Sequence, residues 1–376
     1  MNIKRVKPII VKEFRQIRRD KRSLGVLLVF PAFLVLLIGY ALNFDVKHIS
    51  VAIFDQDKTQ TSRDFVGSFT NSEYFDVNYS VESYKEIDNL LDQSKALVAV
   101  VIPTDFSKEI LAGRNTPIQI LVDGSNSNTA TTAIGYFNTI VQTYSAKLAV
   151  KVLQKQGREL YTPIEIKPKV WYNPELISAK FLVPGLIGFI LMLSAVVSTS
   201  LSVVREKERG TMDQMMVSRL HTGEIILGKT ISFLIIALFA SALVLLIGYF
   251  FFDISIRGSI LWLYVGIFIF LLASLGQGLL ISAISHTQQV AFIISVFSTL
   301  LPALILSGFV FPIRSMPYAL QIISNLTPPK YFLIVIRDVI LKGAGVGAFW
   351  DQLVYMLIFA AVTLGVSSRL LLKKAK

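Results

Sequence analysis

The chain has 376 residues, of which 53% are hydrophobic and only 16% are charged. About a quarter of the residues of a soluble globular domain are usually charged, so the composition excludes an ordinary soluble protein. The net charge is +12 and cysteine is absent, so no part of the chain depends on a disulfide. The basic excess lies beside apolar segments, which indicates membrane topology and contact with a lipid bilayer, and excludes a nucleic-acid footprint.

Six apolar stretches reach the length of about 20 residues that a bilayer core requires. They are residues 24–42, 181–204, 231–252, 260–284, 290–311 and 353–372. Apart from Arg369 near the end of the last stretch, none has an acidic or basic residue in its interior. The first has a long basic flank and no small-residue cleavage site after it, so we interpret it as a retained span. The sequence predicts a polytopic α-helical membrane protein with six spans and an inserted α/β (α+β) domain.

The distribution of basic residues predicts the orientation. Residues 1–23 contain nine Lys/Arg, the loop 205–229 contains five, and the tail from Arg369 contains four. The short loops on the opposite side contain five. The positive-inside rule therefore predicts that both termini are cytoplasmic and that residues 44–179 are extracytoplasmic. Within residues 1–23, apolar residues recur at helical spacing between basic ones, which predicts an amphipathic helix in the headgroup plane.

Residues 44–179 alternate between strand and helix patterns. We expect strands over residues 49–54, 74–79, 97–102, 118–122 and 164–171 and helices over residues 61–69, 83–93, 104–111 and 126–156. Ser83 with Glu86 three residues on is a capping pattern. This alternation favours a layered sheet covered by helices. Residues 312–350 contain two apolar stretches, 316–325 and 331–341, which are too short to cross and predict external re-entrant or interfacial helices.

The loop 205–229 carries the sharpest local signal. Residues 205–209 alternate in charge, Gly210 and Thr211 break the run, and methionines follow. Exposed methionines framed by charges suit docking to a partner's groove, because methionine adapts to irregular surfaces and charges set specificity. The alternative is a solvated interfacial elbow. Residues 223–230 match the P-loop pattern, but aliphatic inner residues before a span predict a continuous helix with Lys229 at the headgroups, and no nucleotide site.

Other chemistry is weakly indicated. His48, His221 and His286 lack metal-ligand spacing, and a turn followed by a helix start explains the aspartates of residues 55–64, so we expect neither a metal site nor a catalytic site. The spans contain no carboxylate or histidine that could relay protons, so the energy source must lie outside the chain. Most polar residues in the spans are expected to hold helices together. Gln277, Ser298 and Thr299 are the candidates for lining a path.

Several blocks resemble a known family, the permeases of the ABC-2 type, in its bacterial exporter branch with a large extracytoplasmic domain. The blocks are KEFRQIRRDKRS, FDQDKTQTSRDF, ILVDGSNSNTA, VWYNPELISAKFLVPG, VVREKERGTMDQMM, LSGFVFPIRSMP and TPPKYFLIVIRDVILKG. Members are commonly described as multidrug or drug-efflux permeases. The resemblance covers nearly the whole chain and implies the transmembrane half of an exporter in the bacterial inner membrane.

The resemblance also implies partners. Residues 205–217 would be a coupling helix in a groove of a separate ABC ATPase, which would carry the ATP and magnesium, with no cofactor on this chain. The contact positions would be Arg205, Glu206, Glu208, Gly210, Thr211, Asp213 and Met216. A second permease chain, in a homodimer or a paired heterodimer, would complete the path, and the outer domain would meet a periplasmic adaptor (membrane fusion) protein, as expected for Gram-negative relatives. An apolar path would suit an amphipathic, drug-like or lipid-like substrate.

Two other interpretations remain open from the residues. An ATP-independent secondary transporter or channel would need ionisable residues in the spans or an inverted repeat, and the arrangement of one span followed by five offers neither. A membrane-anchored receptor or adhesion protein would place its function in residues 44–179 and would not need the charged loop.

Overall fold

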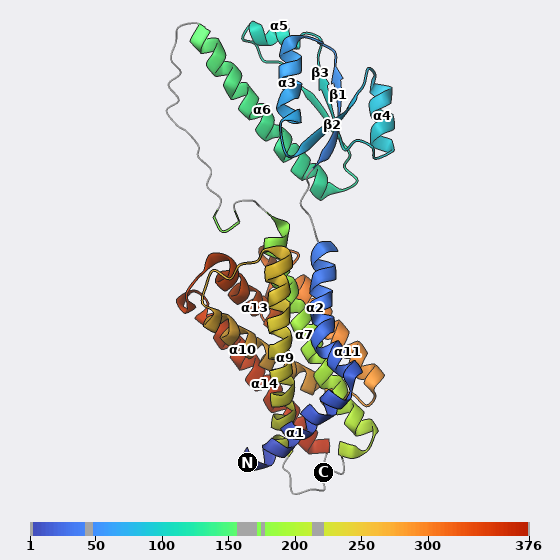
Figure 1. Cartoon of the computed structure of the whole chain (residues 1–376), viewed down its shortest axis with the longest axis vertical. Coiled ribbons are helices and arrows are strands. Elements are labelled where there is room, and N and C mark those ends of the chain that lie inside the picture. Colours follow the sequence, from blue (N-terminus) through green and yellow to red (C-terminus); the bar gives the residue numbers. More distant parts are fainter. Residues whose placement is uncertain (1–2, 42–47, 156–170, 174–176, 213–221, 375–376) are drawn as a thin grey trace. The chain divides into compact units, whose positions relative to one another are not determined.

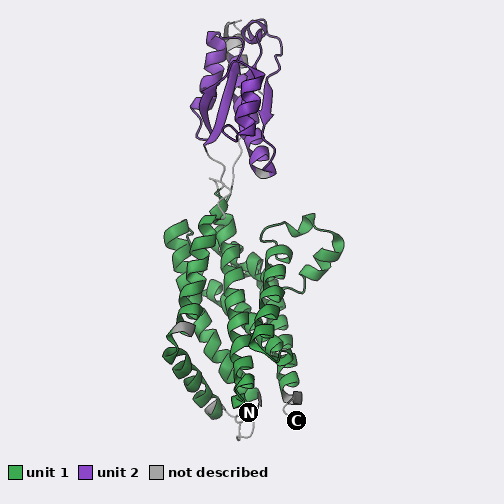
Figure 2. Cartoon of the chain, turned by 90° about the vertical axis from the view of Figure 1, so that its right-hand side faces the viewer, with its two compact units in different colours: residues 1–44, 169–376 green, residues 45–168 purple. Residues whose placement is uncertain are grey.

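The computed structural model describes residues 3–41, 48–155, 171–173, 177–212 and 222–374. The chain divides into two compact units, one comprising Met1–Phe44 and Lys169–Lys376 and the other Asp45–Pro168 (Figure 2). The second unit is one continuous stretch of chain, and the first is built from the two stretches on either side of it.

The unit of residues 45–168 is a four-stranded mixed sheet with helices on both faces (Figure 1). Its strands are β1 (Ile49–Asp55), β2 (Phe75–Ser80), β3 (Val98–Ile102) and β4 (Gln119–Val122). Its helices are α3 (Gln60–Thr70), α4 (Tyr84–Asp92), α5 (Phe106–Leu111) and α6 (Ser127–Lys155). The strand order is β2-β1-β3-β4, with β4 antiparallel to β3 and the other pairs parallel. These elements confirm the predicted alternation; residues 164–170 of the predicted last strand lie outside the described residues, and Trp171 is not in a strand.

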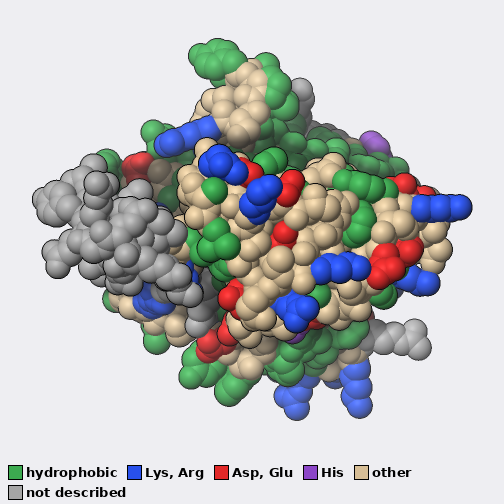
Figure 3. Space-filling view, turned by 90° about the horizontal axis from the view of Figure 1, so that it is seen from above, with side chains coloured by type: hydrophobic (Ala, Val, Ile, Leu, Met, Phe, Trp, Pro, Cys, Tyr) green, Lys and Arg blue, Asp and Glu red, His purple; other side chains and the backbone are tan. Residues whose placement is uncertain are grey.

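The central strand β3 is buried on both faces, and its side chains alternate between two apolar cores. Val98, Val100 and Ile102 pack in a core with the aromatic rings of α3, α5 and α6. Ala99 and Val101 face the opposite way, into a smaller core with Ile87 of α4. This period of two is what a pleated strand imposes. The Ser83 hydroxyl accepts a hydrogen bond from the Glu86 backbone N–H, as the capping pattern predicts. On the face that Figure 3 presents, the described basic and acidic side chains are interspersed.

The other unit is a helical bundle (Figure 1). Its long helices are α1 (Ile3–Arg19), α2 (Lys21–Ala41), α7 (Ser178–Glu208), α9 (Thr222–Phe252), α10 (Ile260–Ile284), α11 (Gln288–Leu301) and α14 (Trp350–Lys374). A π-helical turn, Pro302–Leu306, continues α11. All except α1 are long and apolar enough to cross a membrane, which confirms the six predicted apolar helices. Helices α7 and α9 extend into the predicted 205–229 loop, so residues 205–208 and 222–229 are helical.

Helices α7 and α10 form the centre of the bundle. In their most apolar windows 72% and 67% of the residues are buried, whereas the value is 22% for α2 and α11 and 28% for α14. The outer helices therefore keep broad apolar faces on the surface of the isolated chain, which lipid or another protein must cover in a membrane.

Between α11 and α14 the chain forms the short helices α12 (Tyr318–Ser324) and α13 (Pro328–Arg337). A π-helical turn, Asp338–Lys342, follows α13 and ends at Gly343, whose φ is 66°. Helix α13 is packed into the bundle, where the Phe332 ring stacks on Phe270 of α10 with centroids 4.0 Å apart. Two short helices agree with the prediction for residues 312–350; the side of the membrane on which they lie stays a prediction.

Helices α7 and α10 approach closely because α10 has a glycine, Gly278, at the contact. A Cβ atom on Gly278 would lie 2.7 Å from the Val196 carbonyl oxygen and 3.1 Å from the Thr199 Cβ. Real Cβ atoms do not approach backbone oxygen so closely, so one of the two helices would have to move.

We expect Gly278→Ala to destabilise the bundle by about 1–3 kcal/mol, as overpacking a close contact usually does. The matched control is Gly365→Ala, a glycine of α14 with nothing within 4 Å of its added Cβ. Thermal unfolding in detergent, followed by tryptophan fluorescence, compares the two variants. Equal midpoints would contradict the close α7–α10 contact.

Candidate functional site

The predicted coupling segment begins as the last turn of α7. The helix ends at Glu208, the N–H of Arg209 bonds to the Arg205 and Lys207 carbonyls, and Gly210 follows with φ 66°. Glycine takes this left-handed conformation without strain, so it is a favoured residue just after a helix end. The break at Gly210 is therefore where the charge pattern predicts it. Asp213 and Met216 lie outside the described residues.

The side chains of this segment do not all face outward. Glu208 and Arg209 are exposed, and Arg205, Gly210 and Thr211 are half-buried. Met212 is only 4% exposed and packs with Val203, Ile226, Leu279 and Leu371. The expectation of exposed methionines is thus wrong at Met212, because this side chain belongs to the apolar core between α7, α9, α10 and α14.

Glu206 is also buried, with 6% exposure. Its Oε2 lies 2.9 Å from the Lys229 Nζ, and its Oε1 accepts from the Lys12 ammonium. The carboxylate faces the chain's own interior, which corrects the expectation of a surface contact here. Its role toward an ATPase stays a prediction.

Lys229 is the centre of this buried charge cluster, which we define as Lys12, Glu13, Glu206 and Lys229; three members are buried, and the Lys12 side chain, at its edge, is 43% exposed. The Lys229 Nζ lies 2.9 Å from the Glu13 Oε1 as well as from Glu206, and Lys229 is 1% exposed. Lys12 lies 3.4 Å from the Glu13 Oε1. The prediction that Lys229 sits at the headgroups is wrong, because two carboxylates from α1 and α7 compensate its charge inside the bundle.

The cluster balances two cations against two carboxylates. Burial alone would lower the pKa of Lys12, but the hydrogen bond and charge of Glu206, with those of Glu13, outweigh it and raise the pKa. Lys12 therefore stays protonated at neutral pH, and its share of stability would be lost only as the pH rises through that raised pKa. A balanced, hydrogen-bonded cluster tolerates burial, whereas an unpaired buried charge does not.

The glycine of the P-loop-like pattern has a packing role. Residues 223–230 are part of continuous α9, with no bend that could surround a phosphate. A Cβ atom on Gly228 would lie 2.6 Å from the Ile9 Cγ2, so the missing side chain lets α1 approach α9. That approach brings Glu13 to Lys229. The match to GxxxxGK[ST] thus reflects helix packing.

A second set of polar contacts ties the end of α7 to the start of α11. The Gln288 N–H donates to the Glu208 Oε1 at 2.8 Å, and its side-chain amide donates to the other carboxylate oxygen. The Arg205 Nε donates to the Gln288 Oε1 at 3.2 Å. A carboxylate at a helix N-terminus is favourable, because the first N–H groups of a helix lack internal partners. No local pattern pointed to Gln288, since its partners are 80 and 83 residues away.

The candidate path residues lie between α10 and α11. The Gln277 side-chain amide donates to the carbonyl and the hydroxyl of Ser298, both at 3.3 Å. Thr299 is fully buried, and its hydroxyl has no hydrogen-bond partner in the described part of the chain. Gln277 and Ser298 therefore hold two helices together, while path lining by any of the three stays a prediction.

Metal chemistry finds no support in the geometry. Among the described residues, no three histidine or acidic side chains come close enough to hold an ion. Acidic and basic groups instead pair with each other at the ends of α1, α7 and α9. The bundle has the long apolar helices of an integral membrane protein, and one of its central helices, α7, leads directly into a charged loop.

The comparisons with known proteins agree with this class. The sequence model of the ABC-2 family transporter proteins matches residues 21–369, so the chain belongs to this family. It is 35% identical over 355 residues to the probable multidrug ABC transporter permease YbhR of Escherichia coli K12, covering 94% of this chain and 95% of that protein. It is 33% identical over 341 residues to YbhS of the same organism, which bears the same description, covering 90% and 89%.

A eukaryotic relative is longer. The ABC transporter G family member 20 of Dictyostelium discoideum is 26% identical over 344 residues, which are 89% of this chain and 46% of that protein. Membership of the ABC-2 family implies in general an ABC ATPase partner and a membrane dimer.

We expect Lys229→Met to destabilise the bundle by about 3–5 kcal/mol, because Glu13 and Glu206 would lose their shared cation inside the protein. Adding Glu13→Gln to that variant removes one of the two uncompensated carboxylates, so part of the lost free energy of unfolding should be recovered. Unfolding in detergent by graded denaturant measures both. Lys85→Met, at an exposed position of α4, is the control and should change stability by less than about 0.5 kcal/mol. Equal effects at positions 229 and 85 would contradict the cluster.

Proposed function

We propose that this chain is the transmembrane subunit of an ABC exporter, driven by a separate ATPase that docks on residues 205–217. It has no catalytic site of its own, and ATP and magnesium bind to the partner. Two permease chains line the path, and an amphipathic, drug-like or lipid-like substrate leaves the cytoplasm or the inner leaflet. The multidrug descriptions of YbhR and YbhS support this substrate class.

One observation carries the proposal: α7 runs without interruption from the centre of the bundle to the charged segment. Its middle is the most enclosed part of the bundle, and its end carries the exposed Glu208 and Arg209. A partner that displaces residues 208–212 would therefore also displace the middle of the bundle, because one continuous helix connects the two. The buried charge cluster makes α1 and α9 follow the same movement.

The proposed orientation places both termini in the cytoplasm and residues 44–179 outside the inner membrane. The basic residues near the N-terminus and in the loop after α7 support it. A periplasmic adaptor protein is a candidate partner for the unit of residues 45–168. A receptor or adhesion protein remains the alternative, with that unit as its functional part.

The docking test exchanges two exposed charges without changing the net charge. Glu208→Lys/Arg209→Glu should reduce co-purification of the ATPase about tenfold or more, because reversed charges at an interface oppose the partner's field. The control is Lys85→Glu/Asp88→Lys, two exposed residues on α4. The assay is affinity purification from membranes with quantitative mass spectrometry.

These charges are better test sites than Glu206, because reversing a buried carboxylate would disturb the fold itself. Normal ATPase recovery with Glu208→Lys/Arg209→Glu would reject docking on this segment. If the native chain recovers no ATPase while it is folded, a receptor or an ATP-independent transporter becomes the better description.

The orientation test uses the absence of cysteine. Ser125→Cys lies at an exposed position of the unit of residues 45–168, and Arg18→Cys lies at an exposed position of α1. A membrane-impermeant maleimide should label Cys at position 125 only in right-side-out vesicles and at position 18 only in inside-out vesicles. The opposite pattern, or labelling of both sites on one side, would contradict the proposed topology.

A further inference from the structure

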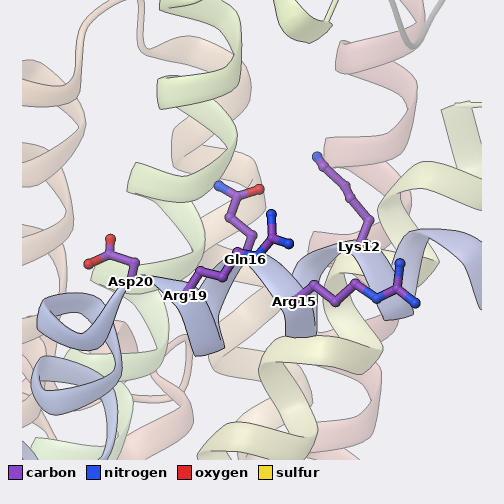
Figure 4. A pocket seen from close by; sticks show the side chains of 5 residues that line it. All are labelled: Lys12, Arg15, Gln16, Arg19 and Asp20. Carbon is purple, nitrogen blue, oxygen red and sulfur yellow. The ribbon is translucent and has the colours of Figure 1, made fainter.

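Helix α1 borders a basic hollow on the surface of the bundle. The hollow measures 690 Å³ and is lined by Lys12, Arg15, Gln16, Arg19 and Asp20. Figure 4 shows these side chains along one stretch of α1, with Lys12, Gln16 and Asp20 directed to the same side of the helix. Three cations thus surround the hollow against one carboxylate, and the site favours an anion.

Two of these cations are available to a ligand. Lys12 is engaged by Glu206 and Glu13. Arg15 and Arg19 are exposed, and neither forms an ion pair within the described part of the chain. They are four residues apart, so they lie on one side of the helix. The planar guanidinium group presents paired N–H donors whose spacing fits phosphate oxygens.

The basic hollow adjoins an apolar groove. A second cavity of 270 Å³ shares Gln16 and Asp20 with the first. It extends between α2, α7 and α9, where Val26, Leu27 and Phe233 supply apolar walls. Ser198, Ser202 and Arg205 of α7 also line it. A smaller cavity deeper in the bundle shares Leu27 and Phe233 with it, so the apolar surface continues inward.

We propose that the two hollows form a binding site for one anionic phospholipid. The phosphate binds Arg15 and Arg19, and an acyl chain lies along Val26, Leu27 and Phe233. A free anion would use the basic hollow alone, and a protein would not need the groove. Only a charged head joined to a hydrocarbon chain fits both parts. The site differs from general attraction of a basic helix to a membrane because it has a defined stoichiometry and a defined groove, and it does not depend on the transport proposal.

The head-group test compares two pairs of basic residues on the same helix. Arg15→Gln/Arg19→Gln removes the proposed phosphate ligands. Lys7→Gln/Arg18→Gln removes two other exposed charges of α1 that do not line the hollow. Delipidated protein is titrated with phosphatidylglycerol or with phosphatidylcholine of the same chains, and native mass spectrometry counts the bound lipid.

The native chain should bind one phosphatidylglycerol more tightly than phosphatidylcholine. Arg15→Gln/Arg19→Gln should weaken phosphatidylglycerol binding about tenfold or more, since hydrogen bonds to charged groups are lost, and Lys7→Gln/Arg18→Gln should not. An equal loss of phosphatidylglycerol affinity in both double variants would mean a diffuse charge effect. Unchanged affinity in both would mean that the hollow holds no lipid. Both results overturn the proposal.

The groove test places a bulky ring at two exposed valines of α2. Val26, which is 59% exposed, lines the groove, and Val29, which is 63% exposed, does not. Val26→Trp should weaken binding of both lipids, and Val29→Trp should leave it unchanged. Inorganic phosphate should not displace the lipid.

Two further results would overturn the proposal. One is unchanged binding in Val26→Trp together with displacement of the lipid by inorganic phosphate, which would describe a free-anion site. The other is retained lipid but lost ATPase recovery in Arg15→Gln/Arg19→Gln, which would describe a protein contact. All four variants alter exposed side chains, and unchanged thermal unfolding confirms that each one folds.

Discussion

A lysine held inside the bundle by two carboxylates determines how three helices meet. Lys229 of α9 lies 2.9 Å from Glu13 of α1 and 2.9 Å from Glu206 of α7. Each of these charges is tolerated inside the protein only while the others are present. Helix α1 can therefore lie against α9 only in the register that brings Glu13 to Lys229, and Gly228 removes the side chain that would block this register. The last turn of α7 is fixed at the same point.

The same helix end is also held from the other side. Glu208 and Arg205 hydrogen-bond to Gln288 at the start of α11, and the Ser200 and Ser295 hydroxyls meet at 2.7 Å further along the two helices. The final turns of α7 thus connect α1 and α9 through charges and α11 through hydrogen bonds. A partner that displaced residues 208–212 would strain both sets of contacts together, so a movement there would be transmitted as a shift of packed helices.

The sequence predicted the elements well and their contacts poorly. Continuous apolar stretches identified the six long helices, and alternation with turn residues identified β1 to β4, because both signals depend on neighbouring residues. The charge cluster depends on residues as much as 216 positions apart, which no local pattern reveals. The alternating charges of residues 205–209 could not show that Glu206 points inward while Glu208 points outward. Lys229 was misplaced because a lysine at a span end usually reaches the headgroups, and its two carboxylates come from other helices.

The distance along the chain between the charged partners also sets an order of assembly. Glu13 and Lys229 are separated by 216 residues, so at about 5–20 residues per second the ribosome needs roughly 10–40 s after making α1 to supply its counter-charge. During that interval Glu13 must remain hydrated, because its neighbour Lys12 is exposed and Lys229, the buried cation that pairs with Glu13, has not yet been made. Helix α1 therefore stays in contact with water, without packing into the bundle, while the unit of residues 45–168 and α7 are synthesised. It docks only when α9 arrives, which makes the first helix to be translated one of the last to reach its place.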